Sequence, residues 1–140
     1  MILKIFTDGG SKGNPGPSAI GIVGYTEEGK EILRHREDIG RATNNEAEYT
    51  AVIKALELIH FQISNFKFQI NRIDLYSDSR LMVNQLNGLF KIKKAHIRNF
   101  VFKVRILESE LRLPVYYHHI RREENKVADA LVNGNLKDEI

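Results

Sequence analysis

The sequence predicts an α/β domain in which a five-stranded mixed sheet carries helices on its faces. Short apolar runs that end at glycine, proline or aspartate indicate strands, and longer stretches with apolar residues at helical spacing indicate helices. Along the chain these segments follow the order β-β-β-α-β-α-α-β-α. No linker, repeat or low-complexity segment interrupts the 140 residues, so we expect one domain over residues 1–140.

The first predicted strand leads into a glycine-rich loop. Residues 2–6 are apolar except for one lysine, which predicts a strand buried on both faces. Four glycines and two prolines lie between Gly9 and Pro17, and we expect them to end the strand in a turn. Asp8 would then be a carboxylate at the carboxyl end of a buried strand, which is costly unless the charge is paired or bound to a metal.

Two further strands, at residues 19–25 and 31–39, complete a meander with the first. The turn between them, at residues 27–30, is so short that the two strands must be antiparallel neighbours. Gly21 and Gly24 predict a bulge, or a close approach of another backbone segment, in the earlier of the two strands.

A long helix is predicted at residues 45–62, capped by Asn44 or Asn45. Its inner stripe consists of Val52, Ala55, Leu56 and Ile59. Helical periodicity separates two acids near the start of this helix. Glu48 shares a face with the inner stripe, whereas Glu46 lies on the solvent face, where it complements the positive end of the helix dipole. A glutamate turned toward the core needs a functional reason, so Glu48 is the candidate of the two.

The second half of the chain alternates shorter elements. They are a strand at 72–77, helices at 79–87 and 96–111, a strand at 114–119 and a helix at 126–133. Asp78 stops the first of these strands and could cap the helix that follows. Asn125 is a good cap for the last helix, and Asp129 lies one turn inside it.

Composition restricts the chemistry that this chain can perform. The absence of cysteine excludes disulfides, thiolate metal sites and a cysteine nucleophile. No apolar run approaches the roughly 18 residues of a membrane span, and too few apolar residues precede Asp8 for a secretory signal, so we expect a cytoplasmic protein with no membrane contact. The net charge of +3 gives mild support to a polyanionic partner, and no obligate protein partner is indicated.

Four acids at element boundaries form the candidate site, and they are Asp8, Glu48, Asp78 and Asp129. Two follow strands and two lie near helix starts, at the edge of an open sheet where ligand sites form. Crowded carboxylates repel one another, divalent cations relieve this repulsion, and hard oxygen ligands suit Mg²⁺ or Mn²⁺. Two such ions about 3.5–4 Å apart can activate water on one side and stabilise a leaving oxygen on the other, as in phosphodiester hydrolysis.

Zinc matches the sequence less well, because no pair of histidines has ligand spacing on one helix face. His118 and His119 are adjacent in a predicted strand and therefore point to opposite faces. The metal site is expected to use oxygen ligands alone.

Four segments of the chain occur in the order of one known family. They read TDGGSKGNPGPSAIG, TNNEAEY, YSDSRLMVNQL and REENKVADAL, and together they resemble ribonuclease H of type 1 over nearly the whole chain. The resemblance implies the ribonuclease H-like fold and an endonuclease that uses two Mg²⁺ ions. Such an enzyme cuts the RNA strand of an RNA–DNA hybrid and leaves 5′-phosphate and 3′-hydroxyl ends. Catalysis and metal binding carry over to Asp8, Glu48, Asp78 and Asp129.

The resemblance also implies a set of substrate contacts. They map to Asn14, Thr43, Asn44, Asn45 and Arg80. Amides and bare backbone beside a glycine loop suit the reading of 2′-hydroxyls and sugar shape in the shallow groove of a hybrid.

Two features depart from the family pattern. Many members carry a mobile loop with glycine and histidine before the last acid, and here that loop is shortened to residues 120–125. His119 is one candidate to replace the histidine, and Arg121 or Arg122 could instead stabilise charge on the leaving group. Many bacterial members also carry a basic protrusion with tryptophans. This chain has no tryptophan and only the short basic run at 91–94, which predicts weaker contact with the DNA strand.

Two other functions remain open for the same sequence, a non-catalytic hybrid-binding module and a DNA-cutting nuclease of the same fold. The retention of all four acids argues against the first, and the TNN and GNPGP segments argue against the second. Nucleotide binding by the glycine loop is excluded by spacing, because GGSKGNPG matches neither the dinucleotide-binding nor the P-loop motif.

Overall fold

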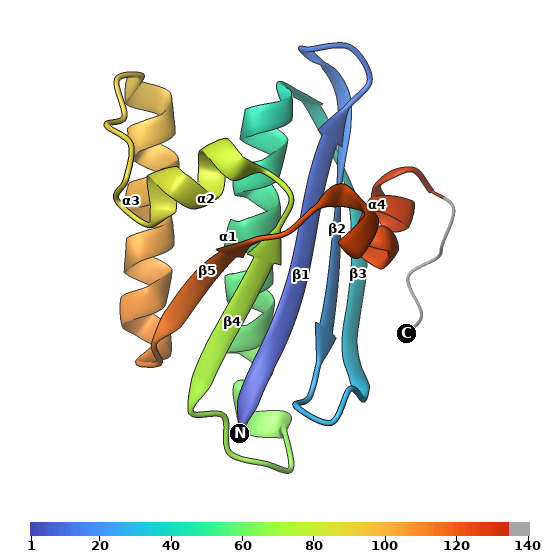
Figure 1. Ribbon diagram of the computed structural model, residues 1–140, viewed down its shortest axis with the longest axis vertical. Helices are drawn as coiled ribbons and strands as arrows, with labels where there is room; N and C mark the ends of the chain where they lie inside the picture. The colour runs from blue at the N-terminus through green and yellow to red at the C-terminus, as the bar shows by residue number, and fades with distance from the viewer. Residues whose placement is uncertain (135–140) are drawn as a thin grey trace.

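The computed structural model describes residues 1–134, which form a five-stranded mixed sheet with helices on its two faces (Figure 1). The strands are β1 (Ile2–Ser11), β2 (Gly16–Tyr25), β3 (Glu31–Ala42), β4 (Arg72–Ser77) and β5 (Val115–His119). The helices are α1 (Asn44–Gln62), α2 (Arg80–Leu86), α3 (Ala95–Leu111) and α4 (Lys126–Val132), with short 3₁₀ turns at Ile63–Asn65 and Arg122–Glu124. This is the element order that the sequence predicts.

The strands lie in the order β3-β2-β1-β4-β5, so the first strand of the chain is the central strand of the sheet. β1 pairs with β2 and β2 with β3 in antiparallel fashion, whereas β1 with β4 and β4 with β5 are parallel. Parallel neighbours need a crossover, and α1 supplies one before β4 while α2 and α3 supply the other before β5. The predicted mixed sheet is confirmed.

The helices divide between the two faces of the sheet. Alternate residues of β1 and β2, including Ile5 and Ile22, are fully buried in the core formed with α1. α4 lies over β2 and β1 on the opposite face, as Figure 1 shows. Because side chains alternate along a strand, Asp8 projects on the α4 side of β1 and Gly9 backs onto the start of α1.

The glycine loop does not end β1 where the sequence predicts. β1 continues past Asp8 to Ser11, because its hairpin partner pairs with it as far as Ser18. Asp8 therefore lies inside the strand, opposite Gly21, and not at the strand end. The turn itself is confined to residues 12–15, between the two paired strands.

The prediction that β1 is buried on both faces is also wrong for its first half. Leu3 and Ile5, on the α1 face, are fully buried, whereas Lys4 and Phe6 on the other face are half-buried. The rings of Tyr25 and Tyr76 lie against Phe6, and the stacked ring centroids of Phe6 and Tyr76 are 4.8 Å apart.

The glycines of β2 have the two predicted roles. A Cβ atom at Gly21 would lie 2.4 Å from the carbonyl oxygen of Ala128, so α4 approaches the strand over bare backbone. The register between β2 and β3 shifts after Gly24, which is the mark of a bulge.

The start of α1 is capped by Thr43, and not by either of the predicted asparagines. The Thr43 hydroxyl accepts a hydrogen bond from the Glu46 N–H at 3.1 Å, and the Glu46 carboxylate accepts one from the Thr43 N–H at 2.8 Å. This reciprocal pair is a capping box. Asn44 and Asn45 are consequently the first two residues of the helix.

Every residue of the predicted inner stripe of α1 is buried. Their neighbours in the core come from β1, β2, β4 and α3. Tyr49 of α1 is buried as well, and its ring stacks on Phe100 of α3. None of the helices found among residues 1–134 is long and apolar enough to cross a membrane.

Candidate active site

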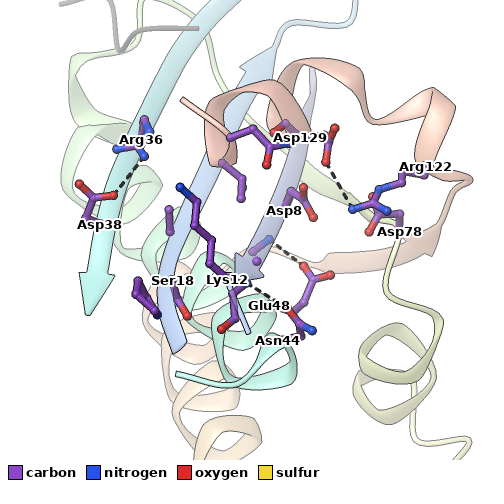
Figure 2. A pocket seen from close by; sticks show the side chains of 17 residues that line it. Asp8, Lys12, Ser18, Arg36, Asp38, Asn44, Glu48, Asp78, Arg122 and Asp129 are labelled. Atoms are coloured by element: carbon purple, nitrogen blue, oxygen red, sulfur yellow. Dashed lines mark hydrogen bonds and ion pairs between the residues drawn. The ribbon is translucent and has the colours of Figure 1, made fainter. Parts of the chain in front are cut away.

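Three of the four predicted acids converge at one point of the sheet (Figure 2). Asp8 from β1, Glu48 from α1 and Asp78 from the loop after β4 each offer a carboxylate oxygen, and these oxygens lie within 4.8 Å of one another. The fourth acid, Asp129 of α4, is hydrogen-bonded to Asp8. Four acids from four separate elements therefore form one cluster.

Asp8 is the central member of this cluster and is only 5% exposed. Burial raises its pKa from 3.8 to about 8, with further contributions from the charges of Asp78 and Asp129 and from the hydrogen bond with Asp129. Arg122 acts in the opposite direction and lowers the pKa of Asp8. Without a cation, the cluster therefore holds a proton at neutral pH.

Glu48 is fixed by the backbone of β1. Its Oε1 accepts a hydrogen bond from the Gly9 N–H at 3.0 Å. The pairing of β1 with β4 ends at Thr7 and Ser77. The Gly9 N–H therefore lies beyond the end of β4 and has no partner in that strand. The carboxylate takes the place of a strand partner and thereby satisfies a buried donor.

Only glycine fits at position 9. A Cβ atom there would lie 2.3 Å from the carbonyl carbon of Ala47 in α1. This close approach brings the first turn of α1 against β1 and sets Glu48 next to Asp8. Burial, followed by the charges of Asp8 and Asp78, raises the pKa of Glu48 well above its ordinary value.

Asp78 is available to the site because it does not cap α2, contrary to the predicted alternative. Ser79 is the cap, and its hydroxyl accepts a hydrogen bond from the Met82 N–H at 3.3 Å. Asp78 instead meets Asn125, whose Nδ2 lies 3.5 Å from its Oδ2 and donates to the Thr7 carbonyl at 2.9 Å. Asn125 is 1% exposed, so this amide ties the start of α4 to β1 from inside the protein.

Asp129 is positioned by contacts at both ends of α4. At the far end, Arg36 of β3 donates from Nε to the Leu131 carbonyl at 2.8 Å. At the near end, Arg122 Nη2 lies 3.7 Å from Asp129 Oδ1. The helix that carries the fourth acid is thus held by the edge strand and by Asn125 together.

The acidic cluster fits a divalent metal site. All of its donors are carboxylate oxygens, which are the ligands that Mg²⁺ and Mn²⁺ prefer. The raised pKa values of Asp8 and Glu48 show that the folded chain brings these charges together at a cost. A bound cation removes that cost, because it favours the ionised form of each ligand.

The acids line part of a cleft of about 500 Å³. The lining continues across the glycine loop to Lys12 and Ser18, and then to Arg36 and Asp38 of β3 (Figure 2). None of these four residues is singled out by the sequence. Their places depend on the β1–β2 turn and on the neighbourhood of β3 and α4, which no local pattern reports.

The predicted substrate residues of the glycine loop and α1 hold each other in place. The Asn44 N–H donates to Asn14 Oδ1, and the Ser11 N–H donates to Asn44 Oδ1, both at 2.9 Å. Asn44 also lines the cleft, Asn45 follows it half-buried, and Thr43 is the helix cap. The structure therefore brings these residues to one rim of the site, and their contact with substrate stays a prediction.

The four remaining candidate residues differ in whether they line the cleft. Arg122 lines the cleft, whereas the guanidinium of Arg121 lies near Glu124 and outside that lining. Arg80 is exposed at the start of α2, and His119 is exposed at the end of β5, and neither lines the cleft. Of these four, Arg122 alone is placed beside the acids.

Several proteins similar to this chain are described as ribonucleases H. A family model described as reverse transcriptase-like matches residues 6–134. A ribonuclease HI of Halobacterium salinarum is 37% identical over 133 residues, which cover 95% of this chain and 63% of the relative. The bifunctional protein Rv2228c of Mycobacterium tuberculosis is 34% identical over 137 residues, and the match covers 97% of this chain but 36% of the relative's length. A solved structure of LC11-RNase H1 in complex with an RNA/DNA hybrid is 37% identical, with a TM-score of 0.86 over 94% of each chain.

Proposed function

Because this chain belongs to the ribonuclease H family, in the group described as reverse transcriptase-like, we propose that it is an endonuclease that hydrolyses the RNA strand of RNA–DNA hybrids. The products carry 5′-phosphate and 3′-hydroxyl ends. The cofactor is a pair of Mg²⁺ ions, which Mn²⁺ can replace. The proposal includes a cytoplasmic location.

One observation carries this proposal, the convergence of oxygens from Asp8, Glu48 and Asp78 within 4.8 Å in a cleft that also contains basic side chains. A structural role does not require three carboxylates to meet, since like charges raise the free energy of the folded state. The arrangement is favourable only when cations are bound, and the same cations are needed for phosphodiester hydrolysis.

The four acids share one task in the proposed reaction, which is to hold divalent cations, and neighbouring groups orient them. Divalent cations held by the four acids supply activation of the attacking water and stabilisation of the leaving oxygen. The Gly9 N–H holds one oxygen of Glu48 and so fixes the orientation of that carboxylate. Asn125 orients Asp78, and Asp8 gives up its proton when the cluster is loaded.

In this proposal, Arg122 replaces the loop histidine that many members of the family carry before the last acid. Its guanidinium lies beside Asp129 and lines the cleft, so a negative charge that develops on the leaving oxygen has a cation nearby. Arg121 and His119 have no comparable position.

The decisive experiment compares three labelled duplexes, an RNA–DNA hybrid, double-stranded RNA and double-stranded DNA, in Mg²⁺ and in EDTA. We expect cutting of the RNA strand of the hybrid in Mg²⁺ and none in EDTA, with 5′-phosphate ends on the products. Asp8→Asn is the inactive control for a contaminating nuclease.

The same assay separates the two alternative functions. Efficient cutting of the DNA strand would identify a DNA nuclease of the same fold. Tight binding of the hybrid without any cutting by the parent protein in Mg²⁺ or Mn²⁺ would identify a binding module.

A further inference from the structure

We propose that Lys12 binds a phosphate of the RNA strand adjacent to the phosphate that is cut. This inference rests on the proposed function and adds a specific contact to it. Lys12 lies in the turn between β1 and β2 and lines the same cleft as the four acids. The sequence patterns assign it no role.

Three basic side chains line this cleft, and two of them already have acidic partners. Arg36 Nη2 lies 3.0 Å from Asp38 Oδ1, and Arg122 Nη2 lies 3.7 Å from Asp129 Oδ1. Within the part of the chain that the structure describes, the Lys12 ammonium has no such ion pair. Lys12 is therefore the basic residue of the cleft whose charge has no acidic partner on the described chain, and a positive charge so placed suits an anionic ligand.

The backbone that carries Lys12 is held firmly although its side chain is exposed. The Lys12 N–H donates to the Pro17 carbonyl at 2.8 Å, and the Ser11 hydroxyl donates to the Ala42 carbonyl at 2.9 Å. A Cβ atom at Gly16 would lie 1.9 Å from the Lys12 carbonyl oxygen, so the two arms of the turn are in direct contact. A fixed backbone lowers the entropy lost when the lysine binds its ligand.

The charges of the cleft favour a phosphodiester strand as the source of this anion. The acids repel phosphates wherever cations do not screen them, so a strand that crosses the cluster needs cations on both sides of it. Figure 2 shows Arg122 and Lys12 on opposite sides of Asp8, with the Lys12 amine extending toward the side where Arg36 lies. A strand that enters beside Arg122 and passes the acids then meets Lys12 at a neighbouring phosphate.

The test compares Lys12→Gln with Lys67→Gln, which changes an exposed lysine in the loop before β4, at the other end of the sheet (Figure 1). Both changes are made in the Asp8→Asn background, and binding to a fluorescent RNA–DNA hybrid is followed by anisotropy between about 50 and 300 mM NaCl, a range over which phosphate contacts change affinity strongly. One phosphate contact contributes about 0.7–0.9 to the slope of log Kd against log salt. We expect Lys12→Gln to reduce the slope by that amount and Lys12→Arg to restore it, while Lys67→Gln leaves it unchanged.

Kinetics in the otherwise native chain give a second readout. Lys12→Gln should raise KM for the hybrid severalfold and leave kcat within a factor of two, because a flanking phosphate contact acts equally in the ground state and in the transition state. A single neutral methylphosphonate can be moved along the positions of the RNA strand that flank the cut. At one of these positions it should abolish the difference in KM between the parent and the Lys12→Gln variant.

The outcomes distinguish this inference from the function on which it rests. If Lys12→Gln has the same salt slope and the same KM as the parent, the phosphate contact is refuted. Cleavage of the hybrid by the parent, and with it the proposed function, would be unaffected by that result. Failure of the parent to cut or bind hybrids would overturn the proposed function first. A change in kcat alone would assign Lys12 to the catalytic step and refute a role in binding a flanking phosphate.

Discussion

Glu46 and Glu48 stand two positions apart on α1 and have opposite electrostatic surroundings. The hydrogen bond from the Thr43 N–H lowers the pKa of Glu46, so this carboxylate is ionised and caps the helix. Burial raises the pKa of Glu48, whose carboxylate faces Asp8. Glu46 therefore stabilises the start of the helix, whereas ionisation of Glu48 is opposed by its surroundings and is favoured by a bound cation.

Exchanging each glutamate for glutamine should separate these roles. Glu48→Gln should reduce kcat by about 100-fold or more, because a neutral amide is a poor ligand for a divalent cation. Glu46→Gln should keep kcat within a few-fold of the parent, because glutamine also completes a capping box. Steady-state cleavage of a labelled hybrid measures both, and equal damage from the two changes would contradict the assigned helix phase.

For single residues, helical periodicity alone predicts that Glu48 faces the core and that Glu46 faces solvent. The same stretch also contained the signature of the capping box, a threonine followed three positions later by glutamate, so Thr43 could have been predicted as the cap. Asn125 could not have been assigned its role. Its position before a helix predicts a cap, whereas burial against β1 turns its amide to the Thr7 carbonyl.

Arg121 and Arg122 are adjacent in sequence, and the structure favours one of them as the residue that assists the leaving group. Arg122→Ala should lower kcat by about tenfold or more, since loss of one stabilising group for a developing charge has effects of this order or larger. Arg121→Ala should stay within about twofold of the parent, because its charge is directed to Glu124. The kcat values of the two variants at saturating hybrid provide the measurement, and the reverse order would exclude Arg122.

Among the elements, β1 differs most from its prediction, because the strand predicted at residues 2–6 extends to Ser11. Glycines normally interrupt a strand, but β1 runs through Gly9 and Gly10 because β2 pairs with it along this stretch, and the close approach of α1 leaves no room for a side chain at Gly9. The strand boundaries therefore depend on tertiary contacts. The pairing of β2 with β1 and β3 also extends β2 and β3, so β2 begins three residues before its predicted start and β3 ends three residues after its predicted end. The other elements, such as β4, follow from local pattern and match their predicted bounds within one residue.

The contact of α4 with Gly21 can be tested by adding one methyl group. Gly21→Ala should lower the free energy of unfolding by about 1–3 kcal/mol, because the new Cβ would meet the backbone of Ala128, which cannot rotate away. Gly10→Ala is the matched control on the same face, where the nearest atom to the new Cβ would be a side-chain methyl of Val132, 3.1 Å away, and not backbone. Urea denaturation of both variants measures the difference, and an equal or smaller loss for Gly21→Ala would show that α4 can shift at little cost.

For the molecule as a whole, the acid cluster makes stability depend on pH and on cations. The pKa of Asp8 is about 8 in the folded chain and 3.8 when unperturbed, so the folded state binds the proton more tightly. The stabilisation from this proton is complete below pH 3.8 and is lost as the pH rises through about 8. At about pH 7.5 without cations, most of it has been lost.

Asp8→Asn should therefore melt at a higher temperature than the parent in EDTA at about pH 7.5. A gain of about 1 kcal/mol or more is expected, since one pKa unit corresponds to about 1.4 kcal/mol. The difference between the two proteins should shrink toward about pH 5, where the parent retains its proton. Thermal melts at about pH 5, 7.5 and 9 provide the measurement.

Magnesium supplies the control for this prediction. Mg²⁺ should raise the melting temperature of the parent more than that of Asp8→Asn, because the parent binds the ion more tightly in its native state. A variant that is less stable than the parent in EDTA at every pH would show that Asp8 is held by a hydrogen bond that asparagine cannot make, and the repulsion argument would fail.

The central place of the first strand has a consequence for synthesis on the ribosome. β1 emerges first and can pair with β2 at once, but its other edge has no partner until β4 has emerged. Asp8 and Glu48 can meet early, whereas Asp78 and then Asp129 arrive only with later parts of the chain. The proposed metal ligands are therefore completed in the order of translation, and Asp129 arrives last, with α4. The proposed hydrolysis needs all four acids, so we expect it to begin only after α4 has been synthesised.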